Sequence, residues 1–141
     1  QRVETARTGG ELIAGKVVIA STGGHMIIDG GGQFRYTPGP PDHVYRPSVD
    51  VFFDSIHALK ATPGVAVVLT GMGRDGAAGL ERLRVARWHT IAQDRVTSVV
   101  WGMPGAAAEL GAAIQILPVR EIAGAITSHM MLQLAAFRRT A

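Results

Sequence analysis

A short glycine-rich segment places an acidic side chain where chemistry is expected. The apolar run at residues 65–69 predicts a buried strand, and residues 70–76 form a loop ahead of a predicted helix. In open α/β sheets, ligands bind at the carboxyl ends of the strands, which is where this loop lies. Its Asp75 is suited to orient a histidine and to stabilise the imidazolium that forms when that histidine deprotonates a serine. The structural alternative is an aspartate that caps the helix and offsets its dipole.

The same loop also has the form GxGxxG, with glycines at Gly71, Gly73 and Gly76, and Asp94 follows eighteen residues later. This spacing is close to that of a dinucleotide-binding fingerprint, so a Rossmann-type nucleotide site is an alternative function. Two observations weigh against it. Asp75 would bring a carboxylate next to the pyrophosphate, and the motif lies in the middle of the chain, whereas the fingerprint usually opens its domain.

The elements that position this loop alternate along the chain. Residues 17–20 form a β-branched run that predicts a strand, and residues 26–37 predict a β-hairpin around a glycine-rich turn. From Ser48, a predicted N-cap, helices are expected at 48–59, 76–86, from Pro104 and 118–138, with strands at 65–69, 88–92 and 114–117. This order predicts an α/β fold: a doubly wound, mostly parallel sheet with an antiparallel β-hairpin at one edge, in one domain over residues 1–141.

Composition excludes several classes of protein. Of the 141 residues, 47% are hydrophobic, which is the usual globular level, and 18% are charged, which is below the usual quarter. The chain is therefore neither disordered nor a charged coiled coil. There is no cysteine, so disulfide scaffolds, thiolate zinc sites and cysteine nucleophiles are excluded. The net charge is +3, but the arginines are scattered and do not form the basic stripe that nucleic acid needs. No apolar run is long enough for a membrane span, and the first residues are unlike a signal peptide.

Four segments, in order, carry a family resemblance. The chain resembles the chemotaxis protein-glutamate methylesterases, the CheB family. Residues 45–50 are similar to the family's RPSVD segment, residues 68–80 to LTGMGxDGAxGL, and residues 90–104 to TxAQDxxTSVVxGMP. Residues 19–26 occupy the place of IAPGGxHM. The resemblance covers residues 17–111 and implies a cytoplasmic hydrolase with a Ser-His-Asp triad that demethylates glutamyl esters on chemoreceptors and also deamidates glutamines.

The resemblance also implies roles for particular residues. Asp75 would be the triad acid, and the backbone N–H of Met72 would help to form the oxyanion hole. Arg46, Gln93 and Asp94 would line or support the rim of the same site. No cofactor and no metal are implied, and the five histidines have no metal-ligand spacing. The implied partners are the methylated cytoplasmic helices of chemoreceptors and an upstream phospho-receiver domain, with no nucleic acid and no membrane insertion.

This sequence departs from the family at the nucleophile. The family's serine turn and the histidine that follows it precede the segments matched here, so the chain alone is expected to be inactive. It is interpreted as the C-terminal part of a catalytic domain or as a non-catalytic relative. Ser21 stands in an Ala-Ser-Thr-Gly-Gly run, but a predicted hairpin follows it where a nucleophile elbow requires a helix. Ser21 is therefore predicted to be a turn residue.

Three further expectations follow from the pattern. His25 is the only histidine near a candidate site. Met130 and Met131 are expected to pack in the core from the last helix. A parallel sheet without its first strand has an uncovered edge, so self-association through that edge is expected.

Overall fold

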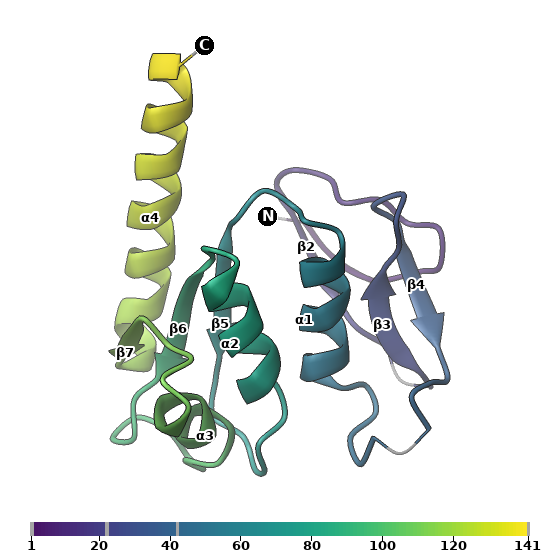
Figure 1. Ribbon diagram of the computed structural model, residues 1–141, viewed down its shortest axis with the longest axis horizontal. Helices are drawn as coiled ribbons and strands as arrows, with labels where there is room; N and C mark the ends of the chain where they lie inside the picture. Colours follow the sequence, from purple (N-terminus) through teal and green to yellow (C-terminus); the bar gives the residue numbers. More distant parts are fainter. Residues whose placement is uncertain (1, 22, 42, 141) are drawn as a thin grey trace. The chain divides into compact units, whose positions relative to one another are not determined.

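The computed structural model describes residues 2–21, 23–41 and 43–140 (Figure 1). They fall into two compact units, Gln1–Ala61 and Thr62–Ala141, and each unit is described by itself. The first contains β1 (Arg2–Thr5), β2 (Lys16–Ile19), β3 (His25–Ile28), β4 (Phe34–Thr37) and α1 (Val49–Ala58). The second contains β5 (Val65–Val68), α2 (Ala77–Val85), β6 (His89–Gln93), α3 (Met103–Glu109), β7 (Gln115–Leu117) and α4 (Val119–Thr140).

Strands β1 and β2 form a parallel pair in the first unit, with Val3 opposite Val17 and Thr5 opposite Ile19. The sequence pattern predicted β2 but not β1. Strand β1 is four residues long and mostly polar, and it is fixed by its pairing with β2 and not by a pattern of its own. Lys16 Nζ lies 3.0 Å from a carboxylate oxygen of Glu4, which joins the two strands through their side chains.

Strands β3 and β4 form the predicted antiparallel hairpin, as a two-stranded sheet of its own. Asp29 shapes the turn, because its Oδ1 accepts the N–H groups of Gly31 and Gln33 at 2.9 and 3.0 Å. Its other oxygen pairs with the Arg35 guanidinium. These contacts, with Arg35 first, lower the pKa of the Asp29 carboxyl below its ordinary value, so the turn is held by an ionised carboxylate.

Helix α1 begins as predicted, with Ser48 as N-cap accepting the Val51 N–H at 3.3 Å. Its apolar face meets the hairpin in a core formed by Ala6, Met26, Ile28 and Phe34, against which Phe52, Ile56 and Leu59 pack. Ser55 Oγ also accepts the Ile28 N–H at 3.0 Å, which fixes the helix on β3.

The second unit is a parallel sheet in the order β5-β6-β7, with helices packed against it. Its most deeply buried side chains include Leu80 and Leu83 from α2 and Ile91 from β6. Consecutive parallel strands, each joined to the next through a helix, lie side by side in this order. The predicted fold class, α/β with parallel strands and an antiparallel hairpin, is confirmed. The hairpin was expected at one edge of the parallel sheet, whereas it forms a two-stranded sheet of its own.

Helix α4 differs from the prediction in its second half. Met130 and Met131, expected in the core, are 39% and 63% exposed, and Leu132, Leu134 and Phe137 are exposed as well. The helix runs for 22 residues, and in Figure 1 its last turns (yellow) extend beyond the rest of the second unit. Helical spacing of apolar residues indicates a helix face, but it does not show whether the sheet is long enough to cover that face. Among the described helices, none combines the length and the apolar character that crossing a membrane requires.

Candidate active site

The loop at residues 70–76 connects the end of β5 to the start of α2, as predicted. Its acidic residue, Asp75, is 8% exposed. The N-cap of α2 is Gly76, which adopts a left-handed conformation with φ +84°, so Asp75 lies one residue before the cap position. A carboxylate is thus held nearly buried at the positive end of a helix, at the carboxyl edge of a parallel sheet.

Gln93 holds the first residue of this loop. It is buried, its Oε1 accepts the Thr70 N–H at 2.9 Å, and its Nε2 donates to the Thr97 carbonyl at 2.8 Å. Gln93 is the last residue of β6, whereas the sequence pattern predicted it in the following loop. From there its side chain links the end of β6 to the loops that contain Thr70 and Thr97, so Gln93 holds the backbone of the candidate site in place.

The Gly71 carbonyl is a second point of attachment. It accepts the N–H groups of Gly102 and Met103 at 3.1 and 2.8 Å, and the Gly71 N–H donates to the Val100 carbonyl at 3.2 Å. A Cβ atom on Gly102 would lie 2.6 Å from the Gly71 oxygen and 2.8 Å from the Gly73 nitrogen. The close approach of these two segments therefore depends on the absence of a side chain at Gly102.

Met72 lies in this loop and is 76% exposed. Among the residues that the structure describes, no acceptor is found for its N–H, whereas the N–H groups of Thr70 and Gly71 are both bonded. A backbone donor held in place close to a helix N-terminus is the kind of group that stabilises an oxyanion. This property belongs to the backbone, so the identity of the Met72 side chain gives no sign of it.

The Asp94 side chain forms hydrogen bonds within a local turn. Its Oδ1 accepts the Thr97 N–H at 2.9 Å and the Thr97 hydroxyl at 2.6 Å. The Thr97 hydroxyl also accepts the Val119 N–H at 3.0 Å, which ties the turn to the start of α4. Sequence reasoning did not single out Thr97, although an aspartate three residues before a threonine is a recognisable turn signal.

The remaining residues that the sequence singled out lie in the first unit. Arg46 is exposed in the loop before α1. Ser21 is followed by strand β3 and not by the helix that a nucleophile elbow needs, and its N–H donates to the Tyr36 hydroxyl at 2.8 Å. His25 is fully buried, and its Nδ1 accepts the Ser48 N–H at 3.2 Å.

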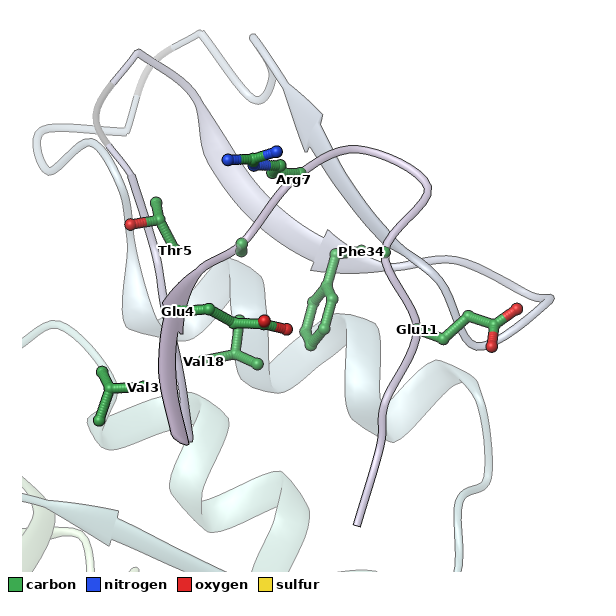
Figure 2. A pocket seen from close by; sticks show the side chains of 9 residues that line it. Val3, Glu4, Thr5, Arg7, Glu11, Val18 and Phe34 are labelled. Atoms are coloured by element: carbon green, nitrogen blue, oxygen red, sulfur yellow. The ribbon is translucent and has the colours of Figure 1, made fainter. Parts of the chain in front are cut away.

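A cavity of about 470 Å³ lies beside β1 in the first unit. Figure 2 shows Glu4, Val18 and Phe34 projecting into the same space, with Arg7 and Glu11 on the loop beside it. Glu4 is already paired with Lys16, and the side chains around this space include no serine or histidine. It therefore contains neither the serine nor the histidine of a Ser-His-Asp triad.

Two histidines stack in the second unit, where His89 of β6 and His129 of α4 lie with ring centroids 4.2 Å apart. His89 Nε2 is 2.9 Å from Gln115 Oε1. Burial, and then the neighbouring His89, lower the pKa of His129 below its ordinary value. In the described part of the chain, no three His, Asp or Glu side chains are grouped as a metal ion would require.

Comparison with known proteins identifies the family. The family model for the CheB methylesterases matches residues 1–126. The chain is 51% identical over 121 residues to protein-glutamate methylesterase/protein-glutamine glutaminase 2 of Cupriavidus metallidurans, covering 86% of this chain and 36% of that protein. It is 55% identical over 115 residues to protein-glutamate methylesterase/protein-glutamine glutaminase of Mesorhizobium japonicum, covering 80% of this chain and 33% of that protein. The chain thus spans about a third of the length of these relatives.

A solved structure agrees with these matches. The fold superposes on the crystal structure of the Thermotoga maritima CheB methylesterase catalytic domain with a TM-score of 0.81 and 32% identity, over 87% of this chain and 67% of that one. A match at this identity and coverage goes beyond a shared fold. The chain therefore belongs to the CheB methylesterase family.

Proposed function

We propose that this chain supplies the acid and the oxyanion loop of a protein-glutamate methylesterase and glutaminase. One observation carries the proposal: Asp75 is held almost buried at the start of α2, in a loop that Gln93 and Gly102 fix from two sides. In this assignment, Asp75 accepts the Nδ1–H of a catalytic histidine and stabilises its charged form after it deprotonates a serine. The Met72 N–H donates to the oxyanion of the tetrahedral intermediate.

The serine and the histidine of this triad are not assigned to residues of this chain. The environment of Ser21 supports a turn role, because it precedes a strand. Arg46, Gln93 and Asp94 are assigned to the rim and its support, with Gln93 and Asp94 acting through the loops that they hold. The substrate class follows from the family resemblance: methylated or amidated glutamyl side chains of chemoreceptor cytoplasmic helices, in a protein that acts in the cytoplasm beside a phospho-receiver domain.

The experiment uses a chimera in which this chain replaces the matching segment of the Cupriavidus metallidurans relative. Methanol release from methylated receptors is measured for the chimera and for Asp75→Asn. Asparagine keeps the shape but loses the charge, so kcat should fall by roughly 10⁴ with KM little changed. The control is Glu81→Gln, an exposed position on α2 that should keep full activity. Activity within a few-fold of the parent in a folded Asp75→Asn chimera would remove Asp75 from the triad.

A second measurement addresses the dinucleotide alternative with the 141-residue chain alone. The methylesterase assignment requires no nucleotide, so titration with NAD or NADP should produce no saturable heat. Micromolar binding that is lost on Asp94→Ala would favour the nucleotide assignment of residues 71–76.

A further inference from the structure

The second half of α4 carries an exposed apolar stripe. Met130, Leu134 and Phe137 are spaced four and three residues apart, which places them on one face of the helix. Phe137 is 72% exposed. The family model ends at residue 126, so this half of the helix lies outside the region that defines the family. The proposed active site therefore does not account for the exposure of these apolar side chains.

The stripe forms one wall of a groove of about 550 Å³, and Thr62, Pro63 and Arg87 form the other. Gln133 Nε2 donates to the Pro63 carbonyl at 3.0 Å, which fixes the helix against the loop before β5. The groove is thus bounded by a helix and by loops at the amino ends of β5 and β6. A row of apolar side chains at helical spacing is the surface on which another amphipathic helix packs.

The charges at this groove are of one sign. Arg87 lines it, and Arg138 and Arg139 follow Phe137 directly at the end of α4. No Asp or Glu follows Glu121 in the sequence. The second half of α4 from another copy would bring the same cations and no carboxylate, so the charges favour a partner of opposite sign.

We propose that this groove docks an amphipathic helix of a partner protein, whose apolar stripe is flanked by aspartate or glutamate side chains. Methionine at the edge of the groove suits such a surface, because its flexible side chain adapts to the partner. The groove lies at the amino ends of the strands, and the loop at residues 70–76 lies at their carboxyl ends. A helix bound here leaves the candidate active site open and holds the unit next to its partner.

The test uses the 141-residue chain and two fluorescein-labelled synthetic helical peptides with the same leucine stripe, one flanked by glutamates and one by lysines. Fluorescence anisotropy should show saturable binding of the glutamate peptide only, weakening as salt is added. Phe137→Glu should lower the affinity at least about tenfold, since it removes an aromatic side chain that the bound peptide would bury and adds a charge that repels the peptide's glutamates. Leu132→Glu is the matched control: it is 71% exposed on the same helix but does not line the groove, and affinity should stay within about twofold.

The double substitution Arg138→Glu with Arg139→Glu should weaken binding of the glutamate peptide and strengthen binding of the lysine peptide. Circular dichroism checks that α4 stays helical in this variant. Binding of both peptides alike, or of neither, would overturn the proposal. A different outcome is that the chain co-sediments with phosphatidylcholine/phosphatidylglycerol vesicles, loses this in Phe137→Glu and binds neither peptide. That result would overturn the proposal and assign the stripe to a lipid surface. A dimer that Phe137→Glu dissociates would assign it to a second copy.

Discussion

Gln93 Oε1 accepts the Thr70 N–H at 2.9 Å and so joins the end of β6 to the loop that carries Asp75. Replacing Gln93 by methionine keeps the volume but leaves a part-buried N–H without its acceptor. We expect a loss of about 1–3 kcal/mol in the free energy of unfolding, measured by urea denaturation. Gln133→Met, which also removes one amide-to-backbone bond, lies at a half-buried site and should lose less. Equal stability of Gln93→Met and the parent would show that this bond does not hold the loop.

Gly102 and Gly124 make a matched pair for alanine substitution. The three heavy atoms nearest to a Cβ on Gly102 would be backbone atoms of Gly71 and Gly73, so the two loops would have to separate. We expect Gly102→Ala to lower stability by about 1–3 kcal/mol. At Gly124, inside α4, nothing lies within 4 Å of the added atom, and alanine should raise stability by about 0.5–1 kcal/mol. Both changes are read from thermal melts, and a neutral Gly102→Ala would contradict the close approach of the loops.

The lowered pKa of His129 predicts a pH dependence of stability. The folded protein favours the neutral imidazole, so the unfolded chain takes up the proton first as pH falls. Stability should therefore decline as pH drops below about 6.5, and this decline should end once pH passes the lowered folded pKa. Melting temperatures at pH 7.5 and 5.5 should differ less for His129→Gln than for the parent. His57→Gln, at an exposed position on α1, should retain the parent's pH dependence.

The position of β5 at one end of the strand order in the second sheet predicts self-association. Among the described strands, β5 pairs only with β6, and its sequence Val-Ala-Val-Val is apolar throughout. Such an edge pairs readily with another strand, so sedimentation should show oligomers that increase with protein concentration. Val67→Lys should shift the distribution toward monomer, whereas Val85→Lys, exposed on α2, should not. A parent chain that remains monomeric at high concentration would contradict this prediction.

Local signals explain which parts of the fold the sequence predicted. Ser48 as N-cap and the glycine turn after Asp29 act within a few residues, and both are found where expected. Strand β1 was missed because its evident structural partner is β2, more than ten residues away. The exposure of Met131 was missed for a similar reason: the pattern identifies an apolar face but not the extent of the surface facing it.

The candidate site was predictable to the same degree. The motif placed Asp75 and Met72 in one loop after β5, and the structure has them there. The hydrogen bonds that hold this loop could not be predicted from the sequence. They join segments more than twenty residues apart, from Gln93 to Thr70 and from Gly102 to Gly71. Arg46 belongs to the first unit, so its assignment to the rim rests on the family resemblance alone.

Helix α4 begins at the Thr97 turn, beside the candidate active site, and its far end flanks the groove by Pro63 and Arg87. At 1.5 Å per residue its 22 residues span about 33 Å. The helix therefore gives the experimenter a ready point of attachment. A dye, affinity tag or surface linker joined at the carboxyl end of α4 would stand about 30 Å from the Asp94–Thr97 turn. Immobilised in that way, the chain would present the loop that carries Asp75 outward, to substrate in solution.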